Sequence, residues 1–177
     1  MMTTQPPISL RNLDLDNQED IASVTKIYAH HVTYGTGSFE ITPPDEAEIK
    51  RRFTALYDRN YPVILACHND DNAIAGFAYF GPYKERAAYH HTVEDSIYVH
   101  PDYLRLGIGQ LMLAELIERA ADAGFLQMMA VIGDSDNAGS FGIHSAMGFQ
   151  MIGTARNIGH KFGRFLDVVY MQKDLSQ

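Results

Sequence analysis

The spacing of hydrophobic positions along the chain alternates between helical and strand periods. Apolar residues recur at helical spacing from Ile21 to Val32, from Ile49 to Tyr57 and from Leu111 to Ala120, as on the buried face of an amphipathic helix. Short apolar or alternating runs, which are typical of strands, occur at residues 8–11, 63–67, 73–80, 92–99 and 125–132. The nearly continuous last run predicts a strand that is buried on both faces.

Turn-forming residues separate these segments and complete the expected order. Asp16 or Asn17 is suited to cap the first helix, and the segment Thr42–Asp45 is suited to start the second. A short helix is expected at 138–147, closed by Gly148, followed by strands at 149–155 and 165–173 that a loop at 159–164 joins. The resulting order, β-α-α-β-β-β-α-β-α-β-β, predicts an α/β protein with a mixed sheet and local antiparallel hairpins.

Length and composition restrict the class of protein. The chain has 177 residues, of which 46% are hydrophobic, so we expect one domain over residues 1–177 with a flexible tail at 1–7. A net charge of -8 argues against nucleic acid or an anionic membrane as the default partner. No apolar run approaches the roughly 20 residues of a membrane helix, and no signal peptide is evident. The single cysteine, Cys67, fits a reducing compartment, so we expect a cytoplasmic location.

Two glycines lie between the strand at 92–99 and the helix that follows it. Because glycine bares the backbone amides and a helix N-terminus carries partial positive charge, Gly107 and Gly109 predict a site for an anion such as a phosphate. A P-loop would need a lysine where the chain has Gln110, and a dinucleotide-binding fingerprint would need a third small residue where it has Met112. Two glycines could also serve only to turn the chain into the helix.

Further motifs surround this loop in a fixed order. The strand is followed by His-Pro-Asp-Tyr-Leu-Arg-Leu-Gly-Ile-Gly at 100–109, a helix, a strand, then Asn137, Ser140, His144 and Gly148-Phe149. This series resembles the GNAT superfamily of acetyl-CoA-dependent N-acyltransferases, in which the loop binds the pyrophosphate of coenzyme A through backbone amides. The resemblance implies acetyl-CoA as co-substrate, with the loop contacts assigned to Arg105, Leu106, Gly107, Ile108, Gly109 and Gln110. Leu104 stands where the family has Arg or Gln, so that side-chain contact is missing.

Four other segments, at 81–89, 92–99, 130–133 and 159–164, narrow the resemblance to one branch. They are similar to the phosphinothricin and methionine sulfoximine N-acetyltransferases, and the similarity runs from about Ile8 to Lys173. It implies a GNAT-like, mostly antiparallel sheet with a splayed central strand pair, flanked by helices on both faces. It also implies a small amino-acid-like acceptor and a homodimer.

Glu94 is the candidate general base, which would take the proton that the attacking ammonium must lose. Alternation divides the side chains of this strand between two faces. Glu94, Ser96 and Tyr98 lie on one face, and Val93, Ile97 and Val99 lie on the other. Partial burial would raise the pKa of Glu94 toward a useful value. Glu94 could instead be an edge glutamate paired with Arg86 or Lys84, but the family resemblance favours the base.

The resemblance also assigns residues to the coenzyme. In the family this strand splays from its neighbour and admits the pantetheine arm, which implies backbone contacts with Ile97, Tyr98 and Val99, the Val99 amide being the donor to the acetyl oxygen. Asn137 and Ser140 match positions beside the pantetheine, although either could simply cap its helix. His144 stands where many relatives have a tyrosine near the sulfur, and could protonate the thiolate or only pack locally.

The acceptor substrate is assigned to the loop before the strand. Lys84, Glu85 and Arg86 form a charged run that would ordinarily be solvated, but the resemblance implies that its cations pair with a carboxylate, phosphinate or sulfoximine oxygen. Tyr89 and Phe39 would wall the pocket, although such residues are more often core. The backbone at Asp95 and Ser96 would face the amine, and Asp95 interrupts the apolar face of the strand, which suggests a β-bulge.

Other classes of function stay open at the level of sequence. The histidines show no ligand spacing, so we expect no metal. A protein N-terminal or polyamine acetyltransferase, a non-catalytic coenzyme A-binding module and a nucleotide-dependent oxidoreductase are the alternatives. The expected activity is transfer of acetyl from acetyl-CoA to the α-amine of a phosphinothricin-like or methionine sulfoximine-like acceptor.

Overall fold

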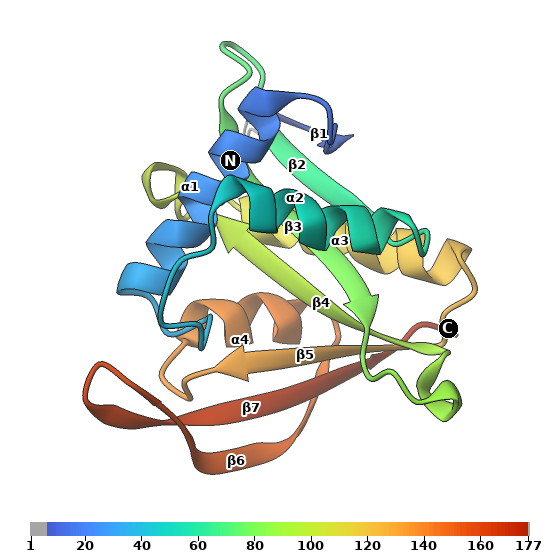
Figure 1. The fold of residues 1–177 in the computed structure, drawn as a ribbon. Helices are drawn as coiled ribbons and strands as arrows, with labels where there is room; N and C mark the ends of the chain where they lie inside the picture. The colour runs from blue at the N-terminus through green and yellow to red at the C-terminus, as the bar shows by residue number, and fades with distance from the viewer. Residues whose placement is uncertain (1–6, 177) are drawn as a thin grey trace, which may run out of the picture.

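A computed structural model describes residues 7–176 (Figure 1). Its helices and strands follow the order expected from the sequence: β1 (Ile8–Asn12), α1 (Gln18–Tyr34), α2 (Glu46–Tyr57), β2 (Val63–His68), β3 (Ile74–Pro82), β4 (Thr92–Val99), α3 (Ile108–Asp122), β5 (Gln127–Gly133), α4 (Ala138–Ala146), β6 (Gln150–Lys161) and β7 (Arg164–Asp174). Two short 3₁₀ turns, η1 (Ala87–Tyr89) and η2 (Pro101–Tyr103), flank β4. The tail expected at 1–7 lies, apart from Pro7, outside the described residues.

The seven strands form one sheet in the order β1-β2-β3-β4-β5-β7-β6. Every neighbouring pair is antiparallel except β4 and β5, which run parallel. The parallel pairing covers only Thr92–Glu94 against Gln127–Met129. Beyond Glu94, β4 continues along β3 to Val99 while β5 continues along β7 to Gly133, so the two central strands diverge (Figure 1). The expected splayed pair is therefore confirmed.

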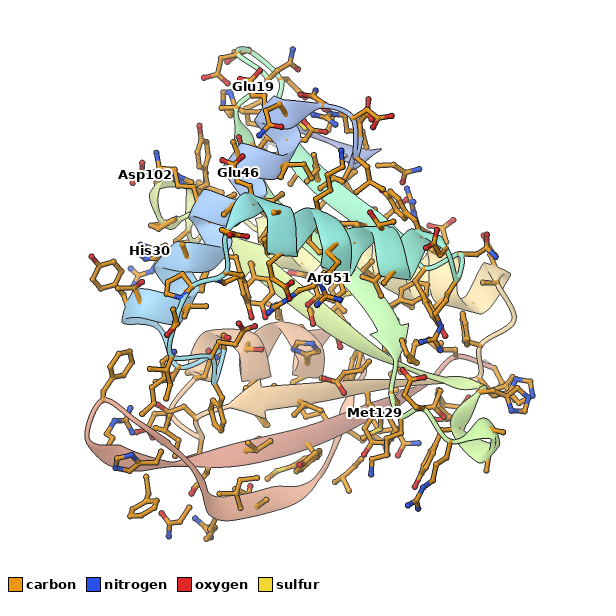
Figure 2. All side chains as sticks on the ribbon, viewed as in Figure 1. Glu19, His30, Glu46, Arg51, Asp102 and Met129 are labelled. Atoms are coloured by element: carbon orange, nitrogen blue, oxygen red, sulfur yellow. The ribbon has the colours of Figure 1, made fainter. Side chains whose placement is uncertain are left out.

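Helices cover both faces of the sheet, and alternation in β2 shows how the faces divide. Ile64 and Ala66 pack with the apolar stripe of α3, whereas Leu65 packs with α1 and α2, and all three side chains have no exposed area. Figure 2 shows the opposite sides of α1 and α2 carrying charged side chains such as Glu19 and Glu46, both exposed. Amphipathic helices thus bury two separate apolar layers against one sheet.

Local capping sets the ends of the helices as the sequence indicates. The side chain of Asn17 accepts the amides of Glu19 and Asp20 at the start of α1, which satisfies backbone donors that the helix leaves free. Gly124 and Gly148 follow α3 and α4 with φ of +85° and +84°, a conformation that glycine adopts without steric cost.

Two local expectations are wrong. The β-bulge expected at Asp95 is absent, because β3 and β4 pair without a register shift from Gly76↔Val99 to Pro82↔Val93. The loop expected at 159–164 is mostly strand: β6 runs to Lys161, and only Phe162 and Gly163 turn, with φ of +53° and +72°. Pairing with β7 satisfies the backbone of this segment, so its glycine-rich composition does not keep it irregular.

Within the described part of the chain, no helix is both long enough and apolar enough to cross a membrane.

Candidate active site

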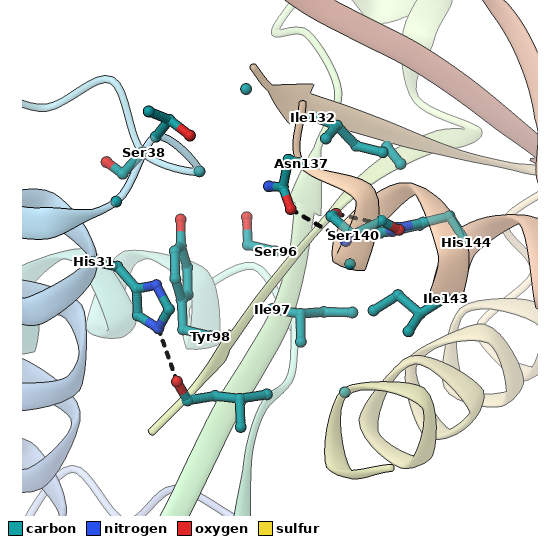
Figure 3. Close-up of a pocket in the computed structure, with 18 of the residues that line it drawn as sticks. His31, Ser38, Ser96, Ile97, Tyr98, Ile132, Asn137, Ser140, Ile143 and His144 are labelled. Carbon is teal, nitrogen blue, oxygen red and sulfur yellow. Dashed lines mark hydrogen bonds between the residues drawn. The ribbon is translucent and has the colours of Figure 1, made fainter. Parts of the chain in front are cut away.

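The divergence of β4 from β5 opens a cavity of about 1080 Å³. Its walls come from β4, the ends of β5 and α1, the α1–α2 loop, the segment before α3, and the start of α4. Figure 3 shows His31 and Tyr98 on one side of the cavity and Asn137, Ser140 and His144 of α4 on the other, with Ile97 between them. The sheet thus brings together residues that are far apart in the sequence.

Hydrogen-bond alternation in β4 directs one set of backbone amides toward the gap. Tyr83 N donates to the Thr92 carbonyl and His100 N to the Ala75 carbonyl, which places the amides of even-numbered residues of β4 on the β3 side. The amides of Ile97 and Val99 therefore point away from β3, into the space that β5 has left. The amide of Tyr98 points to β3, so at Tyr98 it is the side chain that lines the cavity.

Glu94 lies where β4 and β5 separate, half-buried and lining the cavity. Burial, together with the negative charge of Asp95, raises the pKa of Glu94 to about 7. The alternative pairing with Arg86 or Lys84 does not occur: among residues 7–176, no salt bridge involves Glu94. A carboxylate with this pKa can take a proton from an ammonium near neutral pH.

The other buried or half-buried carboxylates around the cavity each have a cationic or ionisable partner. The pairs are Glu40 with Arg52 at 2.6 Å, Asp134 with Arg164 at 2.6 Å, and Asp95 with His144 at 3.0 Å. The hydrogen bond from Arg52 lowers the pKa of Glu40. Burial opposes ionisation of Asp134, but the Arg164 hydrogen bond outweighs it and the pKa of Asp134 falls. Glu94 therefore stands apart from these carboxylates in its charge environment.

Asp95 and His144 form a buried pair between β4 and α4. His144 Nδ1 donates to the Ser140 carbonyl at 2.7 Å, and His144 Nε2 lies 3.0 Å from Asp95 Oδ2. Burial lowers the pKa of His144, but the hydrogen bond and charge of Asp95 outweigh it, so the pKa is raised above its ordinary value. The other oxygen, Asp95 Oδ1, is buried with no hydrogen-bond partner among the described residues.

This pairing limits the roles that the sequence suggested for His144 and Asp95. Both ring nitrogens of His144 are occupied, so His144 could protonate a thiolate only by releasing the Asp95 carboxylate or the Ser140 carbonyl. The Asp95 side chain faces α4 rather than the Glu94 face of β4, which leaves only its backbone for the acceptor amine. Asp95, the acidic residue on the apolar face of β4, is therefore accommodated by pairing with His144 of α4 rather than by a β-bulge.

The segment before α3 has the geometry of an anion site. Arg105 and Gly107 have positive φ of +63° and +77°, and Gly107 is the N-cap of α3. The amides of Ile108, Gly109 and Gln110 follow at the helix N-terminus, where a helix offers no internal acceptors. All five of these residues line the cavity, Arg105 being exposed, whereas Leu106 lies beside them without lining it. The segment can hold a phosphate through backbone donors, without the side-chain contact that an Arg or Gln at position 104 would add.

The start of α4 faces the same cavity. The side chain of Asn137 caps α4 by accepting the amide of Ser140 at 3.2 Å. Both residues line the cavity (Figure 3), so the capping role and a position beside a ligand are compatible.

Two residues that the sequence did not single out for the site belong to its surroundings. His31 Nε2 donates to the carbonyl of Val99 at 2.8 Å, and burial lowers the pKa of His31. The hydroxyl of Tyr28 bonds to Ser38 Oγ at 3.0 Å and to Glu40 at 2.7 Å. Helical spacing placed His31 and Tyr28 only on the inner face of a helix. No local pattern could reveal these partners, because Val99, the partner of His31, lies 68 residues further along the chain.

The charged loop before β4 does not line the cavity. Lys84 lies over the rings of Tyr83 and Tyr89 at 5.0 and 5.4 Å, and Glu85 pairs with Arg59 at 3.1 Å. Arg86 is exposed ahead of η1. Of the aromatic wall expected for the acceptor, Phe39 lines the cavity and Tyr89 does not.

Among the described residues, no group of three or more His, Cys, Asp or Glu side chains is arranged to hold a metal ion.

Comparison with known proteins adds to this geometry. Residues 24–149 match the Acetyltransferase (GNAT) family. The chain is 41% identical to the phosphinothricin N-acetyltransferase of Alcaligenes faecalis, over 89% of this chain and 79% of that protein. It is 35% identical to the L-methionine sulfoximine/L-methionine sulfone acetyltransferase of Pseudomonas paraeruginosa, over 88% and 90%. The crystal structure of a phosphinothricin acetyltransferase from Sinorhizobium meliloti in complex with acetyl-CoA superposes with a TM-score of 0.90, at 38% identity, over 95% of this chain and 88% of that one.

Proposed function

Because the chain belongs to the GNAT acetyltransferase family and is an acetyl-CoA-dependent N-acetyltransferase of the phosphinothricin and methionine sulfoximine branch, we propose that it acetylates the α-amine of a small amino acid analogue. The acceptors would be of the phosphinothricin, methionine sulfoximine or methionine sulfone type. The observation that carries the proposal is Glu94, a carboxylate without a salt-bridge partner among residues 7–176, at the point where the central strands separate.

Glu94 acts as the general base in a direct transfer. It takes a proton from the acceptor's ammonium, and the free amine attacks the thioester carbonyl. A pKa of about 7 lets Glu94 be ionised near neutral pH and still accept a proton. As the amide bond forms and the carbon–sulfur bond breaks, the electron pair leaves with the coenzyme sulfur. The nitrogen gives up its second proton, and the sulfur takes up one proton, so that coenzyme A leaves as the thiol.

Backbone amides of β4 orient the thioester. The amide of Val99 donates to the acetyl oxygen and stabilises the negative charge that develops on it. The carbonyl of the same residue accepts from His31, which fixes the plane of the adjoining peptide group. The amide of Ile97, which also points into the gap, bonds the pantetheine arm.

Acetyl-CoA fits the rest of the cavity. Its pyrophosphate would lie at the amides from Arg105 to Gln110, and the charge of Arg105 would add to the attraction. Asn137 and Ser140 would lie beside the pantetheine. His144, held by Asp95, would lie near the sulfur, where its proton favours the leaving thiolate.

The acceptor would enter past the α1–α2 loop. Phe39 lines the cavity on that side, and the backbone of Asp95 would face the acceptor from β4. The backbone of Ser96, expected to do the same, is paired with β3, so only its side chain is directed to the cavity. Lys84, Glu85, Arg86 and Tyr89 lie outside the cavity lining, so their role in reading the acceptor's acidic group stays a prediction.

A panel of acceptors tests the proposed function. Purified protein and acetyl-CoA are incubated with methionine sulfoximine, methionine sulfone, phosphinothricin, spermidine or a short peptide, and free thiol is measured. We expect thiol release with at least one of the three amino acid analogues. Release only with the peptide or with spermidine would refute the proposed acceptor, and no release with any amine, despite acetyl-CoA binding, would favour a non-catalytic module.

The proposal also includes a homodimer and a cytoplasmic location. Both come from the resemblance and the composition rather than from any contact in the structure. Sedimentation equilibrium at micromolar concentration tests the dimer, which a single species of 19.8 kDa would contradict. Cell fractionation tests the location.

A further inference from the structure

The segment Gly159–Arg164 matches the branch in sequence, but the chemistry described above does not use it. It forms the tip of the β6–β7 hairpin, far from α1 in sequence and next to the α1–α2 loop in space. Lys161 lies near the centre of this segment and is only 5% exposed. A buried ammonium is costly unless it is hydrogen-bonded, so its surroundings indicate what it does.

Among residues 7–176, the hydrogen bonds of the Lys161 side chain all go to the α1–α2 loop, and its ammonium also lies 5.1 Å from the centre of the Phe162 ring. Its Nζ donates to the Gly35 carbonyl at 2.8 Å and to the Ser38 carbonyl at 2.7 Å. Among residues 7–176 it forms no salt bridge with a carboxylate, and burial lowers its pKa. One cation therefore holds two main-chain acceptors of a single loop, three residues apart.

Two more contacts of the hairpin brace the same wall of the cavity. A Cβ at Gly159 would lie 2.2 Å from the ring of Phe39, so only glycine lets this ring pack against β6. Arg164 pairs with Asp134, which lines the cavity at the end of β5. Each of these hairpin residues thus contacts a residue that lines the cavity.

The loop from Gly35 to Glu40 lines the cavity along its whole length. Its far end is tied down by Tyr28 and Arg52, which both bond to Glu40. At its near end and centre, Lys161 supplies the bonds from outside the cavity. The amides proposed to bind the coenzyme lie on β4 and before α3, and the hydrogen bonds of Lys161 go to neither segment.

We propose that Lys161 is a positioning residue for the acceptor amine: by holding the carbonyls of Gly35 and Ser38 from the β6–β7 hairpin, it fixes a loop that lines the same cavity as Glu94. The loop, with Phe39 at its centre, sets where the amine lies relative to the base and the thioester. The inference rests on the proposed function only in the choice of acceptor.

The test compares Lys161→Met with the matched variant Lys26→Met, which removes an exposed lysine of α1. KM for acetyl-CoA, KM for the acceptor and kcat are measured separately, with whichever amine the panel shows to be acetylated. Because a misplacement of about 1 Å can cost about 100-fold in rate, we expect kcat/KM for the acceptor to fall at least about tenfold. KM for acetyl-CoA should stay within about twofold, and Lys26→Met should behave as the parent protein.

Amide hydrogen exchange of residues 35–40 gives a readout that needs no acceptor. Faster exchange in Lys161→Met than in the parent, with the rest of the chain protected, supports the proposal. If Lys161→Met fails to fold, Lys161→Gln, which keeps an uncharged donor, is judged by the same measurements. Unchanged exchange at 35–40, or equal rises in both KM values, would overturn the proposal. If no amine is acetylated, the proposed function fails while the exchange measurement still decides the role of Lys161.

Discussion

At the scale of single residues, the carboxylates around the cavity are distinguished by their partners. Glu40 and Asp134 each bond to an arginine, which lowers their pKa values. Asp95 is paired with His144. Glu94 receives burial and a neighbouring negative charge instead, both of which raise its pKa. Glu94 thus stays basic because no residue of the range 7–176 forms a salt bridge with it, whereas the other buried or half-buried carboxylates around the cavity are paired.

Replacing this base should separate catalysis from binding. We expect Glu94→Gln to lower kcat by about 100-fold to 10,000-fold, the usual contribution of a positioned base. The affinity for acetyl-CoA, measured by calorimetry, should be unchanged, because the proposed coenzyme contacts, which include the amides of Ile97 and Val99 on the same strand, do not use the Glu94 side chain. Glu19→Gln, an exposed position on α1 (Figure 2), is the control and should keep full activity. A variant at Glu94 with normal turnover would exclude it as the base.

The raised pKa predicts two opposite dependences on pH. The proposed role of Glu94 as base requires its ionised form, so kcat/KM should rise with pH through an apparent pKa of about 7. Stability should change in the other direction, because the native state holds the Glu94 proton more tightly than the unfolded state does. That contribution is present below the ordinary glutamate pKa and is lost as the pH rises through about 7. Thermal unfolding of Glu94→Gln and the parent from pH 5 to 8 checks this: the variant should gain relative stability with pH, and parallel curves would contradict it.

At the scale of elements, the turn from β4 into α3 shapes the proposed coenzyme site. Gly107 has φ of +77° at the N-cap of α3, and a Cβ there would meet nothing within 4 Å. The need for glycine at this position is therefore one of backbone conformation rather than of space. The turn presents the first amides of α3 to the cavity beside β4.

Alanine at this turn should damage coenzyme binding before acceptor binding. For Gly107→Ala we expect a loss of about 1–2 kcal/mol of unfolding free energy from the left-handed conformation, and a higher KM for acetyl-CoA with little change in KM for the acceptor. Gly142→Ala is the matched control, since this helical glycine also has open space around it and alanine there should be neutral or slightly stabilising. Equal effects of the two substitutions would refute the role of the turn.

At the scale of the whole molecule, the order of the strands creates the site. The cavity exists because β5 leaves β4 to pair with β7, while α1 and its following loop close one side and α4 the other. At the edge of the sheet that β1 forms, Arg11 makes two hydrogen bonds of 2.6 Å with the buried Asp20 of α1. That pair joins the first strand to the first helix, away from the cavity.

Breaking this pair should weaken the fold without changing the chemistry. Burial opposes ionisation of Asp20, but the bonds from Arg11 and the Asp14 amide outweigh it and lower its pKa. Its contribution is thus present at neutral pH and is lost as the pH falls through its lowered pKa. We expect Asp20→Asn to cost about 1–3 kcal/mol in denaturant unfolding at pH 7, with kcat and both KM values unchanged. Asp16→Asn, at a side chain 98% exposed, should cost less than about 0.5 kcal/mol; a similar loss in both would contradict the prediction.

The sequence by itself determined which segments are helices and strands and where several of them end. Periodicity fixes the buried faces, and Asn17, Gly124 and Gly148 act within one turn of the chain, so local rules suffice for them. The resemblance in the motifs around Glu94 and Gly107 also indicated the family and its coenzyme. Local rules were wrong at Asp95 and at 159–161, where a distant partner decides the structure.

Only the tertiary structure decided the contacts that shape the site. His144 meets Asp95 across 49 residues, and Lys161 meets Ser38 across 123. Neither pair follows a spacing that could be recognised along the chain, because each depends on the strand order that places α4, the hairpin and the α1–α2 loop around one gap. The same dependence sets the raised pKa of Glu94, which is due to burial and to a neighbouring charge, and both exist only once the sheet has formed.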